Sequence, residues 1–129
     1  MIVLDTHAWI WWTAGSESIP ASTLNEIESA DVIGIPAICC WELAMLVAKN
    51  RIGLEMDVQA WLEIALQHKR VRLLELTPEI AVLATRLPGK FHGDPADRII
   101  VATSLIHKAC LVTKDEKIRE WGYAQTMWQ

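Results

Sequence analysis

The sequence alternates short apolar runs with longer segments of helical periodicity, and this alternation limits the folds that the chain can adopt. Strands are predicted for the apolar runs at residues 2–4, 32–35, 71–76 and 109–112, with a weaker edge strand at 124–128. Helices are predicted between them, at residues 7–14, 20–30, 37–50, 58–68, 79–87, 94–108 and 116–121. Short apolar strands separated by helices form a parallel sheet covered on both faces. We therefore predict a three-layer α/β/α sandwich around a central parallel sheet of four to five strands.

The size of the chain fits a single domain spanning residues 1–129. Its composition is 52% hydrophobic, which is enough for a sizeable core. The first residues carry no basic leader, which argues against a signal peptide. Glu42 and Lys49 interrupt the longest apolar stretch, so no run reaches the roughly 18 residues of a membrane span. We expect a soluble, cytoplasmic protein with no membrane association.

The three cysteines, Cys39, Cys40 and Cys110, have neither C-x-x-C nor zinc-ligand spacing. We expect them to be reduced core residues. The net charge of −4 does not favour binding of nucleic acid through bulk charge. If the substrate is a nucleic acid, the attraction must be local, through a basic patch or through bound metal ions.

Four acidic residues are predicted to lie at one edge of the sheet. In folds of this kind ligands bind at the carboxyl ends of the strands. Asp5 is the first polar residue after the first strand, and Asp115 follows the run at 109–112 by two residues. Glu42 lies early in the helix that follows the second strand, and Asp97 lies in the first turn of the helix that leads to the fourth. Both helices begin at that edge, so the four acids can converge.

Taken singly, three of the acidic positions near helix starts have structural explanations. Asp94 suits an N-cap before Pro95, and Asp97 at the third helical position suits the helix dipole. Asp115 could cap the short helix that follows it. Glu42 is harder to explain in this way, because it lies in the apolar stretch 38–47 and must be paired or bind a metal ion.

Convergence of the four acids favours a metal site. Clustered carboxylates repel one another, so some must take up a proton or a cation must bind. Oxygen ligands without a histidine cluster suit Mg²⁺, with Mn²⁺ as a substitute, rather than zinc. Divalent ions held by carboxylates are typical of phosphodiester hydrolysis by an activated water.

Four segments, in order along almost the whole chain, resemble the motifs of the PIN-domain family. The similarity is to the small ribonuclease toxins of type II toxin–antitoxin pairs, the VapC type. The segments are Ile2-Val3-Leu4-Asp5-Thr6-His7, Ile38-Cys39-Cys40-Trp41-Glu42-Leu43, the stretch from His92-Gly93-Asp94-Pro95-Ala96-Asp97-Arg98 to Thr103, and Leu111-Val112-Thr113-Lys114-Asp115.

The resemblance implies roles for particular residues. It implies metal-binding or catalytic roles for the four acids, Asp5, Glu42, Asp97 and Asp115, and a water-orienting role for the hydroxyl of Thr113. It leaves Asp94 as either a neighbour of the metal ligands or only the helix cap, and we favour the cap. Where the family usually has small hydroxyl residues before the glutamate, this chain has Cys39 and Cys40. No hydroxyl from that turn is then available to Glu42.

The resemblance also implies an activity and partners. The activity is Mg²⁺-dependent cleavage inside a structured cellular RNA, such as a transfer RNA. The partners are a cognate antitoxin, the RNA, and a second copy of the chain in a homodimer or a toxin–antitoxin hetero-oligomer. Two alternatives stay open: a PIN-type nuclease of RNA processing without an antitoxin, and a non-catalytic acidic binding module. A phosphorylated receiver domain is disfavoured, because the middle strand ends Glu75-Leu76-Thr77 without an aspartate.

Three further features allow either a structural or a functional explanation. Trp9 and Trp12 share a helical face that fills the core or binds a partner. The basic cluster at residues 68–72 is expected to be solvated surface, whereas Arg86, Lys90 and His92 precede Asp94 closely enough to contact phosphate. Arg98 is expected to pair with a neighbouring acid, and His7 is not expected to bind metal.

Overall fold

The computed structural model describes residues 1–129 and contains one five-stranded sheet. Its strands are β1 (Ile2–Leu4), β2 (Ile33–Pro36), β3 (Val71–Leu74), β4 (Cys110–Val112) and β5 (Thr126–Met127). All neighbouring strands pair in parallel, in the order β3-β2-β1-β4-β5. The predicted parallel sheet is confirmed, including the edge strand near the C-terminus.

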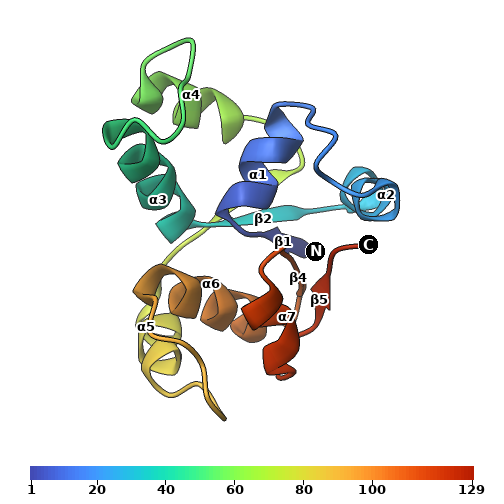
Figure 1. Ribbon diagram of the computed structural model, residues 1–129, viewed down its shortest axis with the longest axis vertical. Coiled ribbons are helices and arrows are strands. Elements are labelled where there is room, and N and C mark those ends of the chain that lie inside the picture. Colours follow the sequence, from blue (N-terminus) through green and yellow to red (C-terminus); the bar gives the residue numbers. More distant parts are fainter.

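Seven helices accompany the sheet. They are α1 (Thr6–Thr13), α2 (Ala21–Ser29), α3 (Ala37–Ala48), α4 (Val58–Ala65), α5 (Pro78–Thr85), α6 (Pro95–Ile106) and α7 (Glu116–Trp121). In Figure 1, α1, α3 and α4 lie on one side of the strands, and α5, α6 and α7 lie on the other. The three predicted layers are therefore present. None of the helices has the length and apolar character that a membrane span requires.

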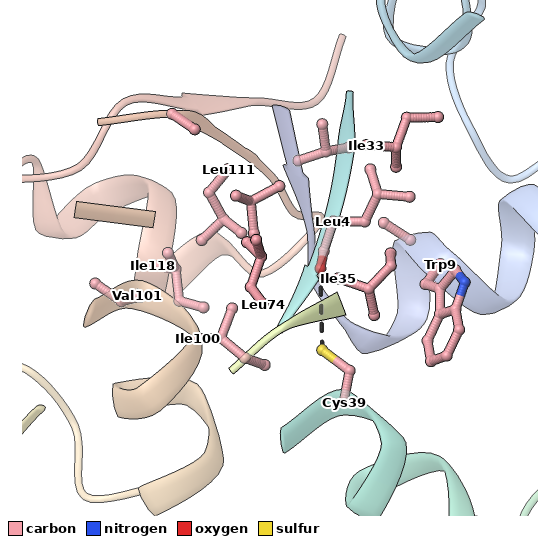
Figure 2. Packing of buried hydrophobic residues seen from close by; sticks show 14 of the residues in the cluster. Leu4, Trp9, Ile33, Ile35, Cys39, Leu74, Ile100, Val101, Leu111 and Ile118 are labelled. Carbon is pink, nitrogen blue, oxygen red and sulfur yellow. Dashed lines mark hydrogen bonds between the residues drawn. The ribbon is translucent and has the colours of Figure 1, made fainter. Parts of the chain in front are cut away.

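The main core lies between the sheet and the helices that cover it. Val3, Leu4, Ile33, Ile35 and Leu111 are fully buried, and Figure 2 shows several of their neighbours from both layers converging on the strands. Strands buried on both faces need apolar side chains at successive positions, which explains the uninterrupted apolar runs in the sequence.

The core also contains residues from the first turns of two helices, α1 and α3. Trp9 of α1 is fully buried and lies edge-to-face on Trp61 of α4, with ring centroids 5.4 Å apart. The thiol of Cys39, in the first turn of α3, points to the carbonyl oxygen of Leu4 at 3.9 Å, as the dashed line in Figure 2 shows. All three cysteines are free thiols, as predicted, but only Cys39 is buried, whereas Cys40 and Cys110 are partly exposed. These contacts fix the starts of α1 and α3 beside the carboxyl ends of the strands.

The third strand is shorter than predicted. β3 ends at Leu74, although the apolar run continues to residue 76. It is an edge strand, and both Glu75 and Leu76 are exposed, so the run extends past the last paired residue.

At the other end of the fold the C-terminus is held by α2, because the backbone nitrogen and hydroxyl of Thr23 both donate to the carbonyl oxygen of Gln129, at 3.0 and 2.9 Å.

Candidate active site

The strand order reverses between β1 and β4, and the candidate site lies at this point. The chain fills the sheet from β1 through β2 to β3 on one side, and then places β4 and β5 on the other side of β1. Leu4 and Val112 pair at the carboxyl ends of β1 and β4, so Asp5 and Thr113 leave the sheet side by side. The backbone nitrogen of Asp5 donates to the carbonyl oxygen of Val112 at 3.1 Å. Such a switch point is where open α/β sheets bind ligands.

Asp5 is held in place by the start of α1. It is the N-cap of that helix, and its Oδ1 accepts a hydrogen bond from the backbone nitrogen of Ala8 at 2.9 Å. Burial raises the pKa of Asp5, and a hydrogen bond from the Thr113 hydroxyl and the bond from Ala8 only partly oppose that rise. The charged form of Asp5 is therefore costly unless a cation lies nearby.

Thr113 and Asp115 form a compact turn after β4. Thr113 is fully buried, and its hydroxyl oxygen accepts from the backbone nitrogen of Asp115 at 3.1 Å. Asp115 caps α7 by accepting from the backbone nitrogens of Lys117 and Ile118, at 2.8 and 3.2 Å. The capping role foreseen for Asp115 is confirmed. Because capping uses one carboxylate oxygen, Oδ1, the other remains free for a ligand.

Glu42 reaches the site from the second turn of α3. Its Oε1 accepts a hydrogen bond from the hydroxyl of Thr6 at 2.5 Å, the short length of a bond to a charged acceptor. Glu42 thus has a hydrogen-bond donor from another helix, and binding of a metal ion, the other outcome expected for it, stays a prediction. The hydroxyl comes from the first turn of α1 and not from the turn before the glutamate, where Cys39 contacts Leu4 instead.

Asp97 enters from the opposite layer, in the first turn of α6. Asp94 caps that helix and accepts from the backbone nitrogen of Asp97 at 3.1 Å, so the cap favoured for Asp94 is confirmed. The pKa of Asp97 is raised to about 7, chiefly by burial and then by the charges of Asp94, Glu42, Asp115 and Asp5. Acids from four separate segments therefore act on one carboxyl group.

The four acids line one cavity of about 600 Å³, which we call the acid pocket. Its other lining residues are Thr6, His7, Trp11, Asp94, Ile100, Lys114 and Glu116. No lysine or arginine forms an ion pair with any of the four acids. The two close pairs of a basic and an acidic side chain are Arg70–Glu28 and His92–Asp97. Uncompensated carboxylates, with oxygen donors only, suit a divalent cation. Potential ligand atoms of His92, Asp97 and Asp115 lie within 4.8 Å of one another.

The sequence did not reveal two contributors to this site. One is the Thr6 hydroxyl on Glu42, which its position next to Asp5 could have suggested. The other is the contact between His92, for which only a phosphate contact was expected, and Asp97, whose Oδ2 lies 3.4 Å from Nε2 of His92. The acid pairing expected for Arg98 is wrong, because its guanidinium donates to the carbonyl oxygens of Ala84, Phe91 and His92. That guanidinium is needed to hold the loop before α6, whose backbone has no strand or helix partner.

The tryptophans of α1 divide between core and surface. Trp9 belongs to the core, whereas Trp12 is half-buried and donates from Nε1 to Glu28 at 3.1 Å. Trp11 borders the acid pocket, where the ammonium of Lys114 lies 5.5 Å from its ring centroid. In the basic cluster near β3, Arg70 is structural, since its Nη1 donates to three carbonyl oxygens at the end of α2.

Comparison with known proteins gives a family match over most of the chain. The sequence model of the PIN domain matches residues 2–122. Ribonuclease VapC22 of Mycobacterium tuberculosis (strain ATCC 25618 / H37Rv) is 39% identical over 129 residues, covering 98% of each chain.

Solved structures share the fold at lower identity. VapBC2 from Rickettsia felis, bound to a DNA fragment from its promoter, superposes with a TM-score of 0.70 at 20% identity and covers 100% of both chains. A toxin–antitoxin complex from Klebsiella pneumoniae gives a TM-score of 0.70 at 19% identity, over 98% of this chain and 96% of that one. FitAcB from Neisseria gonorrhoeae gives 0.67 at 20% identity with the same coverage.

Proposed function

The chain belongs to the PIN domain family, and from that premise we propose that it is a divalent-metal-dependent endoribonuclease, the toxin of a type II toxin–antitoxin pair. The observation that carries the proposal is the acid pocket, where four carboxylates from separate segments meet without a lysine or arginine partner. A relative sharing 39% of its residues is named a ribonuclease, which supports the RNA substrate. Toxin–antitoxin complexes with the same fold support the antitoxin partner.

Asp5, Glu42, Asp97 and Asp115 are the residues that would hold Mg²⁺, or Mn²⁺ in its place. The fit rests on the donor set, which is all carboxylate oxygen at the centre, and on the high cost of leaving the pocket's charges unneutralised. When bound, such an ion lowers the pKa of a water molecule and stabilises charge on the leaving oxygen of a phosphodiester.

Two buried hydroxyl groups keep the carboxylates in position. Thr113 donates to Asp5 and also accepts from the backbone of Asp115, so one side chain sets the spacing of two acids. Thr6, in α1, donates to Glu42 and so holds that acid in place. Because Thr113 is fully buried and does not line the pocket, we infer that its hydroxyl helps to orient the attacking water through the two acids that it holds. Preorganised donors and acceptors of this kind lower the barrier without moving during the reaction.

Cations for the RNA backbone are available beside the acid pocket. Lys114 lies at its rim, next to the ring of Trp11. A second hollow shares Asp94, Asp97, Asp115 and Glu116 with the pocket and is also lined by His92 and Lys117. A third hollow adds Lys90, Phe91 and Trp121. We propose that the RNA strand follows this path, with its phosphates on Lys90 and Lys117 and its cleaved phosphate at the acids. A cytoplasmic location, where structured RNA such as transfer RNA is found, is part of the proposal.

Inducible expression, followed by mapping of cleaved RNA ends, tests the activity and identifies the target. We expect the wild type to inhibit growth and to generate new RNA ends, and Asp5→Asn and Asp97→Asn to do neither. Asparagine keeps the shape of each side chain and one oxygen for the contact with Ala8. The matched control is Asp31→Ala, which should behave as the wild type. It removes an exposed acid that does not line the acid pocket.

The purified protein separates the proposal from its alternatives. RNA cleavage should stop in EDTA and return with Mg²⁺ or Mn²⁺. Cleavage by the Asp97→Asn variant at the wild-type rate, or cleavage that persists in EDTA, would overturn the metal mechanism. Metal binding without any cleavage would favour an acidic binding module. Cleavage that no co-expressed protein from the neighbouring gene suppresses would favour an RNA-processing nuclease.

A further inference from the structure

His92 is the histidine nearest to the acids, and its imidazole occupies a shielded position. The ring stacks on Phe91 with centroids 4.5 Å apart and an interplanar angle of 23°. Its Nε2 lies 3.4 Å from Oδ2 of Asp97, is hidden from solvent, and has no hydrogen-bond partner in the metal-free structure. An unpaired, buried imidazole nitrogen beside a carboxylate is placed to donate to that carboxylate.

The loop that carries His92 is fixed by Arg98. The guanidinium donates from Nε to the carbonyl oxygen of His92 at 3.0 Å and from Nη2 to that of Phe91 at 2.9 Å. Its third bond, from Nη1 to the carbonyl oxygen of Ala84 at 3.1 Å, ties the loop to the end of α5. Because the same helix turn carries Asp97 and Arg98, the imidazole and the Asp97 carboxylate are held by one rigid unit.

The local hydrogen bonds assign the proton of the imidazole. The backbone nitrogen of Asp94 donates to Nδ1 of His92 at 3.4 Å, so Nδ1 carries the lone pair. In the neutral ring the proton is then on Nε2, the atom that faces Asp97. A protonated Nε2 has no lone pair for a metal ion, so in this tautomer it donates to a carboxylate oxygen instead of acting as a ligand.

We propose that His92 is a positioning residue for Asp97: its Nε2–H holds Oδ2, which leaves the second oxygen of Asp97 for the metal ion. This inference rests on the metal site proposed above. Partners that orient ligating carboxylates in this way sharpen a metal site without touching the ion. The role differs from that of the four acids, because His92 acts only through Asp97.

Two amide variants separate donation to Asp97 from support of the loop. Asparagine places its side-chain oxygen near the position of Nδ1, so His92→Asn keeps an acceptor for Asp94 and loses the donor to Asp97. Glutamine reaches as far as Nε2, so His92→Gln restores an N–H donor there. His68 offers a matched control, because its Nδ1 accepts from the backbone nitrogen of Arg70 at 3.2 Å in the same local arrangement, and it is absent from the lining of the acid pocket.

The primary measurement is the affinity of the RNA-free protein for Mn²⁺, determined by isothermal titration calorimetry. We expect His92→Asn to weaken Mn²⁺ affinity by about 10- to 100-fold, His92→Gln to recover most of that loss, and His68→Asn to match the wild type. Electron spin-echo spectra of bound Mn²⁺ should show no directly bound imidazole nitrogen. The thermal unfolding temperature of each variant, measured without metal, should stay close to that of the wild type.

The outcomes distinguish this inference from the proposed function. If the wild type binds no Mn²⁺, the metal site itself is wrong. If the wild type binds Mn²⁺ and His92→Asn binds it equally well, His92 has no positioning role. Equal losses in the asparagine and glutamine variants, or a nitrogen coupling in the spectra, would overturn the assignment of His92 as a donor to Asp97.

Discussion

Asp97 carries a charge that the metal-free fold disfavours, and this makes stability depend on pH. Its pKa is about 7 in the folded chain, against 3.8 for an ordinary aspartate. Below about pH 4 the group is protonated in both the folded and the unfolded chain, so it has no effect. As pH rises toward about 7 the unfolded chain loses this proton first, and the folded state is progressively destabilised relative to it.

Asp97→Asn should therefore stabilise the metal-free protein at neutral and alkaline pH. We expect a gain of roughly 1–3 kcal/mol in the free energy of unfolding near pH 8, after solvent screening, that shrinks toward zero near pH 4. Urea unfolding in EDTA, repeated across that pH range, measures it. Mg²⁺ should reduce the difference, because only the wild type gains from binding the ion. A gain that does not depend on pH would show that the charge of Asp97 is not its cause.

Thr113 should be sensitive to loss of its hydroxyl and insensitive to loss of its methyl group. Thr113→Val preserves the shape but leaves the backbone nitrogen of Asp115 without its acceptor and Asp5 without its donor. We expect a loss of about 1–3 kcal/mol in stability and a fall in kcat of at least about tenfold. Thr113→Ser should retain most of both, as urea unfolding and cleavage kinetics will show. Equal activity in the two variants would remove Thr113 from the mechanism.

The sequence predicts the positions of some residues of the site but not those of others. Asp5 and Asp115 could be placed in advance because Asp5 follows β1 directly, Asp115 follows β4 after two residues, and strand ends meet at one edge. Glu42 and Asp97 could be placed because their helices begin there. The partners of these acids could not, since Thr6 and His92 depend on how α1 sits against α3 and how the loop before α6 folds back on that helix. Such contacts are set by packing, which the order of elements does not specify.

At the scale of elements, the side chain of Leu74 in β3 packs against Gly34 in β2 and leaves no room for a larger residue there. A methyl group at Gly34 would lie 2.6 Å from Cδ1 of Leu74 and 3.4 Å from the carbonyl oxygen of Ile2. Leu74 is only 3% exposed, so its side chain has little room to move. Gly34→Ala should destabilise the fold by about 1–3 kcal/mol.

Gly53→Ala is the matched control for Gly34→Ala. A methyl group there meets nothing within 4 Å, and the backbone is not in the left-handed region. Its effect should stay within about 0.5 kcal/mol. Chemical denaturation of both variants measures the difference. Equal effects would mean that the space between β2 and β3 is not limiting.

The elements themselves were largely predictable, because the apolar runs of β1, β2 and β4 are buried strands and five of the seven helices begin at a capping side chain. Asp5, Asp57, Thr77, Asp94 and Asp115 all cap helices with their side chains. The end of β3 was not predictable from Glu75 and Leu76, since an apolar run does not reveal where an edge strand loses its partner. Nor did the runs specify that β4 lies beside β1, which is the neighbour relation that brings Asp5 next to Thr113.

At the scale of the whole molecule, a chain with a net charge of −4 must bind RNA through the placement of its cations. Bulk charge repels a polyanion, and the acid pocket adds to that repulsion until a metal ion is bound. Lys90 and Lys117 lie in the hollow next to His92, where phosphates flanking the cleaved bond can reach them. Lys49 and Lys69 are exposed but line none of the hollows that adjoin the acid pocket. The position of the lysines and the net charge of the chain can therefore be varied separately by substitution.

The double variant Lys90→Glu/Lys117→Glu should lose RNA binding, whereas Lys49→Glu/Lys69→Glu should lose little, although both change the net charge equally. Each phosphate contact contributes to the dependence of affinity on salt, so the first variant should raise KM for RNA by at least about tenfold and flatten that dependence by about one to two contacts. Its Mn²⁺ affinity should not fall, because neither lysine side chain pairs with the four acids and the exchange adds negative charge beside them. Cleavage kinetics across a range of salt concentrations measure both effects. Equal losses in the two double variants would mean that RNA senses only the total charge, and the proposed path along the hollows would be wrong.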